Sequence, residues 1–181
     1  MLGMLAVHTA VVPQLISSDP TTWAGIASGR SAIVFATLAG VSVALMTGRA
    51  TPPEGDDLVR ARMRLLVRGV CLFAIGGVFQ LITSPVSVIL ESYAVLMVLC
   101  IPLLRWRPRK LFLLAGGIAL FVPTLRLLVS TAGDGVIPWM GYGGLLGSMA
   151  LTGPYPVAVW AAFVVTGLAV GRLALGAAEA G

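Results

Sequence analysis

The stretch Arg105-Trp-Arg-Pro-Arg-Lys-Leu-Phe-Leu-Leu-Ala-Gly-Gly-Ile-Ala-Leu-Phe-Val-Pro-Thr-Leu-Arg-Leu-Leu-Val-Ser130 joins a short basic loop to a long apolar run. A helix needs about 20 apolar residues to cross the roughly 30 Å hydrocarbon core of a bilayer, and the run over residues 111–130 has that length. Lys and Arg concentrate in the cytoplasmic loops of membrane proteins. The stretch therefore predicts a helix that enters the membrane from the cytoplasm.

The rest of the chain repeats this pattern. Of its 181 residues, 58% are hydrophobic and 10% are charged, and the mean hydropathy is +0.99. Because hydrocarbon offers the backbone no hydrogen-bond partners, such a chain folds as membrane-spanning helices. The net charge of +5 could indicate nucleic acid, but the basic residues lie in short loops between apolar runs, which membrane topology explains better. We expect an all-α, polytopic transmembrane helix bundle that binds no nucleic acid.

Six apolar runs are expected to form the spans of a single transmembrane domain over residues 1–181. Their ranges are about 1–16, 31–48, 65–82, 87–104, 111–130 and 155–174. Basic connections follow the second and fourth spans, and Arg172 ends the sixth, whereas the other connections carry only Asp19, Arg30 and Asp134. With the basic connections inside, both termini are cytoplasmic and the protein resides in the plasma (inner) membrane.

Further segments refine this architecture. The run 1–16 lacks the basic start and cleavage site of a signal peptide, so we interpret it as a membrane helix. The Pro/Gly/Asp-rich segment 51–57 is expected to be a flexible link, and the GxxxG motif Gly167–Gly171 to let another helix approach closely. Cys71 and Cys100 each lie within an apolar run and are expected to pack there, since no metal motif accompanies them.

The only histidine, His8, lies inside the first apolar run. At about 1.5 Å per residue it is about 12 Å from the outer end of that run, near mid-membrane. An ionisable side chain is costly at that depth, which favours a functional role as general base, proton relay or nucleophile. A hydrogen bond to a Ser or Thr of another helix is the alternative.

Arg30, Glu91 and Arg126 are charged side chains near the outer ends of predicted spans. Arg30 could bind a carboxylate or phosphate, or extend to lipid headgroups. Glu91, with Tyr93 nearby, could form an ion pair with Arg126, or could orient His8 and raise its basicity. The sequence leaves both alternatives open.

Five segments carry a family resemblance that extends over nearly the whole chain. They are Leu2-Gly-Met-Leu-Ala-Val-His8, Ser28-Gly-Arg-Ser-Ala-Ile-Val-Phe-Ala-Thr-Leu-Ala-Gly-Val-Ser42, Pro85-Val-Ser-Val-Ile-Leu90 with Tyr93, Thr152-Gly-Pro-Tyr-Pro156 and Gly167-Leu-Ala-Val-Gly-Arg172. In this order they resemble the bacterial relatives of heparan-alpha-glucosaminide N-acetyltransferase. The resemblance implies a multi-pass membrane enzyme that takes an acyl group, usually acetyl, from cytoplasmic acyl-CoA and passes it to a sugar or lipid on the other side.

The chain departs from the family pattern near both histidine positions. In the lysosomal enzyme the catalytic histidine stands three residues before a tryptophan that matches Trp23, and here that position is Pro20. The related acyltransferase family three uses a histidine in its first helix, which His8 matches, and an arginine before it that would fall ahead of Met1. Family members also have more spans. The chain therefore looks like the N-terminal half of such an enzyme, and a second membrane half or a homo-oligomer could complete it.

The resemblance implies a role for each candidate site residue. His8 would be the catalytic base toward the acceptor, or would carry the acyl group itself. Acetyl-CoA or another acyl-CoA would be the co-substrate, with no metal, and the glycan or lipid acceptor would enter from outside. A non-catalytic membrane subunit that binds lipid, and a small proton or solute transporter, are the alternatives. The acyl-CoA phosphates would contact Arg64, Arg68, Arg105 and Arg107, and the substrate-binding candidates are Trp23, Arg30, Glu91, Tyr93, Arg126 and Tyr155.

Overall fold

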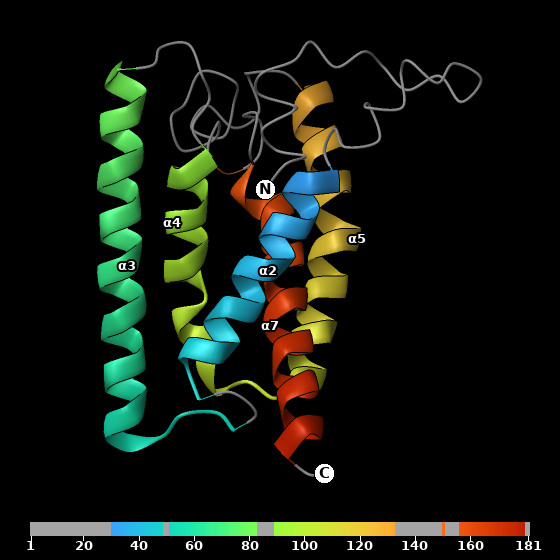
Figure 1. Cartoon of the computed structure of the whole chain (residues 1–181). Coiled ribbons are helices and arrows are strands. Elements are labelled where there is room, and N and C mark those ends of the chain that lie inside the picture. The colour runs from blue at the N-terminus through green and yellow to red at the C-terminus, as the bar shows by residue number, and fades with distance from the viewer. Residues whose placement is uncertain (1–29, 49–50, 83–88, 133–149, 151–155, 180–181) are drawn as a thin grey trace, which may run out of the picture.

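The computed structural model describes residues 30–48, 51–82, 89–132, 150 and 156–179, and the regular elements of this part of the chain are helices. The long helices run alongside one another in an elongated bundle, with α3 at one side and α5 at the other (Figure 1). The expected all-α architecture is confirmed for these residues. The elements are α2 (Arg30–Met46), α3 (Gly55–Ile82), α4 (Ile89–Leu99), the 3-10 helix η2 (Ile101–Arg105), α5 (Pro108–Ala132) and α7 (Val157–Glu179).

Each long helix covers one predicted span, with two differences. α3 begins at Gly55 rather than at residue 65, so the link expected over 51–57 is partly helical. Gly55 adopts a positive φ of 53°, and Asp56 and Asp57 stabilise the positive end of the helix dipole in the first turn. The span expected over 87–104 stops being α-helical at Leu99, because Pro102 has no backbone N–H and the chain continues as η2. The predicted first span, 1–16, lies outside the described residues.

Among the described helices, one is long and apolar enough by itself to cross a membrane. It is the segment Pro108–Leu128 of α5, with a mean hydropathy of 2.0. Only 11% of its most apolar window is buried, so its side chains face outward, unlike those of a core helix in a soluble protein. Arg30–Met46, Leu90–Leu99 and Val157–Leu173 are shorter apolar helices. By length and composition, the described helices thus support one of the six predicted spans.

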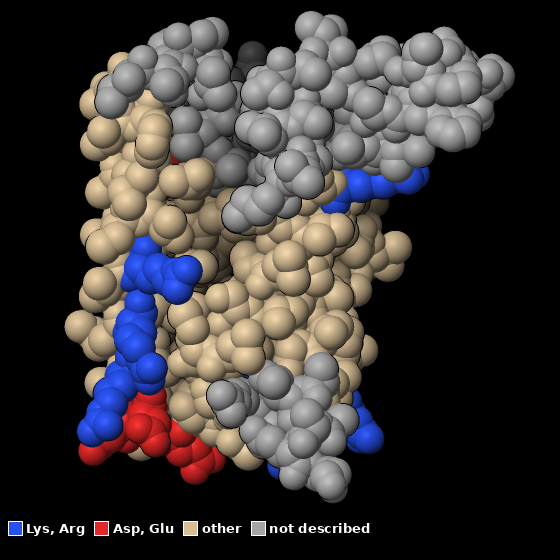
Figure 2. Space-filling model, viewed as in Figure 1, with Lys and Arg blue, Asp and Glu red and all other residues tan. Residues whose placement is uncertain are grey.

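The basic connections lie at one end of the bundle. α2, α4 and α7 end where α3 and α5 begin (Figure 1). We call this the basic end, because it carries the start of α3 and the η2–α5 connection with its arginines. Figure 2 shows Lys and Arg side chains in a stripe along α3 and in small patches at the lower right, an acidic patch at the foot of α3, and a further basic patch near the opposite end. The alternation of basic and non-basic connections in the sequence predicted this segregation.

Glycines form the contact between α2 and α7. A Cβ added to Gly167 would overlap the carbonyl of Thr37, and one added to Gly40 would overlap the backbone of α7. At Gly171 an added Cβ would lie 2.8 Å from the Cβ of Ala44. Only glycine lets two helix backbones approach this closely. The prediction that the GxxxG motif admits another helix is confirmed, and that helix is α2.

The remaining helices attach to this pair from two sides. α5 packs against α7, while α4 contacts α7 and carries α3 on its other side (Figure 1). α3 is buried along one narrow face that includes Ala61, Leu65, Gly69 and Gly76. Because α3 is anchored by this face alone, most of its other side chains are exposed.

Candidate functional site

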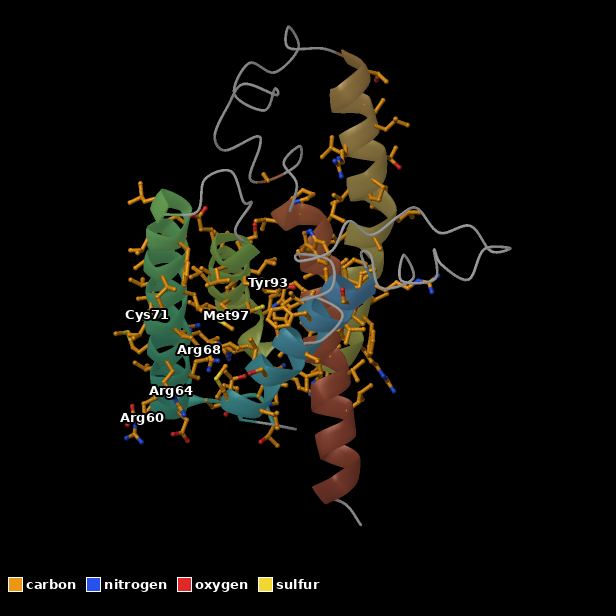
Figure 3. All side chains as sticks on the ribbon, turned by 45° about the horizontal axis from the view of Figure 1, so that its top comes forward. Arg60, Arg64, Arg68, Cys71, Tyr93 and Met97 are labelled. Atoms are coloured by element: carbon orange, nitrogen blue, oxygen red, sulfur yellow. The ribbon has the colours of Figure 1, made fainter. Side chains whose placement is uncertain are left out.

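Three arginines form a row on α3. Arg60, Arg64 and Arg68 follow one another at a spacing of four residues, which places them on one face of the helix. Figure 3 shows them at successive levels of α3, with Arg68 directed toward the end of α2. In the space-filling view, basic side chains form a stripe along α3 (Figure 2). The surface is hollowed beside the upper end of this stripe. We call this row the arginine ladder (Arg60, Arg64 and Arg68).

Two members of the ladder carry a charge that no carboxylate neutralises within the described residues. Arg60 Nη1 lies 3.9 Å from Asp57 Oδ1, in an exposed pair that contributes little. Arg64 Nε donates to the Arg60 carbonyl at 3.4 Å, and Arg68 Nη1 donates to Met46 Sδ at 3.2 Å. A thioether is a weak, neutral acceptor. Arg64 and Arg68 therefore keep their charge for an anion.

A second basic group occupies the corner between η2 and α5. Arg105 ends η2, Arg107 follows it, and Arg109 and Lys110 lie in the first turn of α5, all of them exposed. η2 contacts α3. Of the four predicted phosphate contacts, Arg64, Arg105 and Arg107 thus lie toward the basic end, whereas Arg68 lies about halfway along α3.

A buried arginine holds this corner in place. Arg172 of α7 is 2% exposed, and it donates through Nη1 to the Trp106 carbonyl and through Nη2 to the Leu104 carbonyl, the latter at 2.5 Å. Among the described residues its Nε has no hydrogen-bond partner. The planar guanidinium fork suits one side chain to two carbonyls. Arg172, which the sequence presented only as a topology marker, ties the end of α7 to the basic corner.

Tyr93 and Glu91 lie on α4 nearer the opposite end of the bundle. Tyr93 is 5% exposed, its hydroxyl donates to the Ala32 carbonyl at 3.4 Å, and its ring meets that of Phe35 edge to face with centroids 5.0 Å apart. A Cβ added to Gly76 would lie 2.9 Å from Glu91 Cγ. Tyr93 thus links α4 to α2, whereas Glu91 lies at the contact between α3 and α4.

Arg30 and Arg126 lie on other helices, and both are exposed. Arg30 is the first residue of α2, and Arg126 lies on α5. The described residues contain no ion pair between Glu91 and Arg126, because α2 and α7 lie between α4 and α5 (Figure 1). The structure thus shows no such pair among the described residues, and the alternative roles of Glu91 and Arg126 stay predictions. The other predicted site residues, His8, Trp23 and Tyr155, fall outside the described residues, as does the predicted contact of His8 with Glu91.

Sequence reasoning missed Arg60 as a third member of the ladder and missed the role of Arg172. The four-residue spacing was a signal for the first, since it places charges on one helix face. No local signal existed for the second, because the partners of Arg172 are backbone carbonyls more than sixty positions away. In the part of the chain that the structure describes, no group of three His, Cys, Asp or Glu side chains could hold a metal ion.

The arrangement of the described helices indicates the general class of the protein. A helical bundle with an outward-facing apolar helix and cationic groups gathered at one end is the architecture of a membrane-embedded protein. The family model described as "Heparan-alpha-glucosaminide N-acetyltransferase, catalytic" matches residues 1–180. The chain belongs to this family of membrane-embedded acetyltransferases, which confirms the resemblance noted in the sequence. No curated protein and no solved structure matches the chain.

Proposed function

We propose that the protein transfers an acetyl group from acetyl-CoA, bound at the basic end, to a glycan or lipid acceptor on the other side of the membrane. The arginine ladder carries this proposal, because Arg64 and Arg68 have no carboxylate partner among the described residues. Guanidinium groups bind phosphates through charge-assisted hydrogen bonds, and coenzyme A carries several phosphates. The basic end is cytoplasmic by the distribution of Lys and Arg, which is the side from which the donor would come.

The geometry of the ladder suits an extended donor. Four residues of helix rise about 6 Å, so the ladder spans about 12 Å along α3. Arg105 and Arg107 face the same end from the η2–α5 corner, whose backbone Arg172 holds. At Arg68 a phosphate would replace the Met46 thioether as acceptor, and charge-assisted hydrogen bonds are about twice as strong as neutral ones. The donor would thus run from the corner along α3 toward the middle of the bundle.

The transfer breaks the carbon–sulfur bond of the thioester and forms a carbon–oxygen or carbon–nitrogen bond. His8 would take the proton from the acceptor hydroxyl or amine as that atom attacks the thioester carbonyl carbon, and would return it to the departing thiolate. In the alternative route, the imidazole attacks first and carries the acetyl group to the acceptor. The assignment of His8 rests on the sequence, because this residue lies outside the described part of the chain.

We place the acceptor at the end opposite the basic end. There the Tyr93 hydroxyl reaches α2 at Ala32, two residues from the exposed Arg30. A guanidinium in this position suits the carboxylate of a sugar or the phosphate of a lipid-linked one. The remaining acceptor-binding candidates are Trp23, Glu91, Arg126 and Tyr155.

Transfer of labelled acetyl groups from acetyl-CoA tests the reaction, with purified full-length protein in detergent. We expect thioester consumption by the wild type and a loss of about a hundredfold or more in His8→Ala, as for removal of a general base. Equal rates would remove His8 from the mechanism. No turnover by either protein would favour a lipid-binding membrane subunit, and proton flux in liposomes would favour a transporter.

Calorimetric titration with coenzyme A tests the ladder separately from catalysis. Arg68→Gln should weaken binding about tenfold, the loss of roughly one charge-assisted hydrogen bond. Arg62→Gln is the matched control, because it removes the same charge from α3 at an exposed position off the ladder. An equal loss of coenzyme A affinity in the two variants would show that the positive charge of α3, and not the position of the ladder, determines binding.

A further inference from the structure

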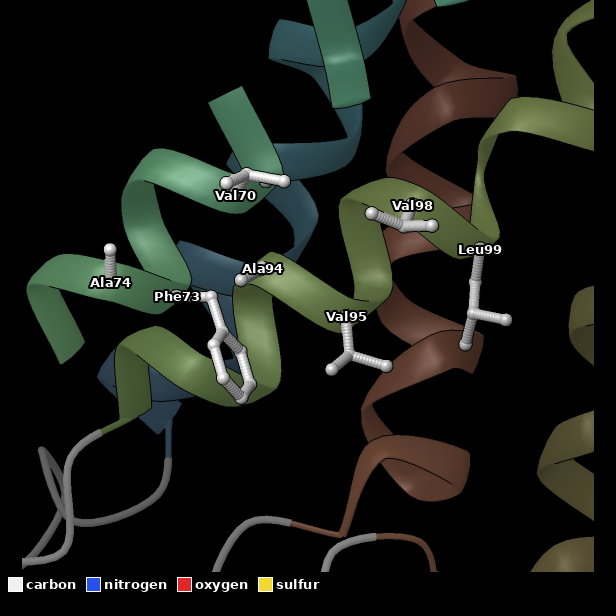
Figure 4. A pocket seen from close by; sticks show the side chains of 8 residues that line it. Val70, Phe73, Ala74, Ala94, Val95, Val98 and Leu99 are labelled. Carbon is white, nitrogen blue, oxygen red and sulfur yellow. The ribbon is translucent and has the colours of Figure 1, made fainter. Parts of the chain in front are cut away.

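A second, apolar site lies on the outer side of the α3–α4 pair. It is a groove with a volume of about 370 Å³, which falls in the range of small-molecule pockets, about 300–1,000 Å³. α3 contributes Gly69, Val70 and Phe73 to its walls, and α4 contributes Val95, Val98 and Leu99 (Figure 4). None of the described residues that line the groove belongs to the ladder or to the predicted site residues.

Small residues at the contact between α3 and α4 form the floor of this groove. A Cβ added to Gly69 would lie 2.9 Å from Val98 Cγ2, so the Val98 side chain packs directly against the backbone of α3 here. Ala74 and Ala94 add little volume at the next turn. The larger side chains therefore stand as walls on either side of a shallow floor.

Among the described residues, α3 and α4 alone line the groove. Of its wall residues, Val70 is 59% exposed, Phe73 is 47% exposed and Leu99 is 50% exposed. By contrast, Tyr93 and Met97, on the other side of α4, are buried. In a membrane-embedded protein this opening faces the acyl chains of the surrounding lipid, so a lipid chain can enter without passing through water.

A single arginine lies below the groove, toward the basic end. Arg62 precedes Gly69 by seven residues, which is nearly two turns at about 3.6 residues per turn, so both lie on the same face of α3. Arg62 is exposed and forms no ion pair among the described residues. At about 100° per residue, Arg64 and Arg68 fall on the other side of the α3–α4 contact. α3 therefore presents the ladder to one side and Arg62 with the groove to the other.

We propose that this site binds one anionic phospholipid from the leaflet at the basic end, with an acyl chain in the α3–α4 groove and its phosphate on Arg62. The order of the parts matches that of the lipid, since the charged group lies toward the basic end and the apolar groove lies deeper along α3. Basic pockets between transmembrane helices on the cytoplasmic side bind anionic lipid headgroups. The groove binds the acyl chain of the lipid, and Arg62 selects lipids whose headgroup is negatively charged.

Native mass spectrometry of the full chain in detergent, with phosphatidylglycerol or phosphatidylcholine added at equal concentration, tests the site. We expect about tenfold tighter binding of phosphatidylglycerol, and loss of that preference in Arg62→Gln. Ala74→Phe fills the groove and should lower the binding of both lipids. The matched controls are Arg68→Gln, which removes a charge from the ladder, and Val67→Phe, which enlarges an exposed side chain outside the groove. Both should retain lipid like the wild type.

Several results would overturn this site. Equal retention of the two lipids, or an equal loss of phosphatidylglycerol in Arg62→Gln and Arg68→Gln, would remove the headgroup contact. Displacement of phosphatidylglycerol by glycerol phosphate would show that binding does not need the acyl chain. Displacement by palmitoyl-CoA but not by coenzyme A would assign the groove to an acyl donor instead.

Discussion

The α2–α7 contact and the α3–α4 contact both use glycines, but they place different atoms against them. At Gly167 the neighbour is the backbone of α2, which cannot move aside. At Gly69 the neighbour nearest to an added Cβ is a methyl group of Val98, which can rotate away. The arginine ladder and the lipid groove both lie on α3. The bundle thus has a tightly packed centre and a more adaptable outer pair that presents its binding groups.

Gly167→Ala is the change with the largest expected effect on stability. Its Cβ would overlap the Thr37 carbonyl, so we expect a loss of about 3 kcal/mol or a failure to fold, at the upper end of overpacking costs. The thermal midpoint of the protein in detergent, measured by size-exclusion chromatography after heating, reports the loss. Gly117→Ala is the control, because an added Cβ there meets nothing within 4 Å and gains about 0.5–1 kcal/mol of helix propensity. Similar midpoints for the two variants would refute the close α2–α7 packing.

Arg172→Met should have the next largest effect. It leaves the Leu104 and Trp106 carbonyls without their donor, and hydrogen bonds to charged groups contribute about 1.5–3 kcal/mol. Arg172→Lys keeps the charge but lacks the fork, so it should recover less than half of the loss. The same heating assay measures stability, and titration with coenzyme A measures whether the η2–α5 corner still binds it. A lysine variant with wild-type stability would show that charge alone, rather than the two-carbonyl clamp, matters.

Tyr93→Phe sharpens the comparison at the junction between the two regions. The change removes the hydrogen bond to Ala32 and keeps the edge-to-face contact with Phe35, so we expect a loss of about 1 kcal/mol. At roughly 2–4 °C per kcal/mol for a chain of this size, the midpoint should fall by a few degrees. A loss as large as that of Arg172→Met would mean that the outer pair is attached as firmly as the centre.

Gly69→Ala should have the smallest effect. Rotation of Val98 can accept the added methyl group, and the gain in helix propensity, about 0.5–1 kcal/mol, offsets most of the strain. We expect the midpoint to change by no more than about 2 °C. A fall as steep as that of Gly167→Ala would erase the difference between the two contacts.

Much of the fold follows from local properties of the sequence. The length and apolar composition of each run predicted a helix, and α2, α3, α4, α5 and α7 cover the five runs that lie within the described residues. The start of α3 and the end of α4 differ from the predicted span limits. These ends depend on single residues, namely Gly55 with its positive φ and Pro102 with its missing amide proton. The sequence left the partner of Glu91 open, because a linear pattern does not say which helices become neighbours.

The sequence by itself determined that the chain is helical and apolar, that its basic connections share one end, and that the small residues of α7 admit a close neighbour. These depend on composition, on run length and on the alternation of loops. Only the tertiary structure decided that α2 is this neighbour, that Arg172 binds two distant carbonyls, and that Arg68 and Arg62 face opposite sides of the α3–α4 contact. Long-range neighbours depend on how the helices pack, and packing depends on the shapes of all the faces together.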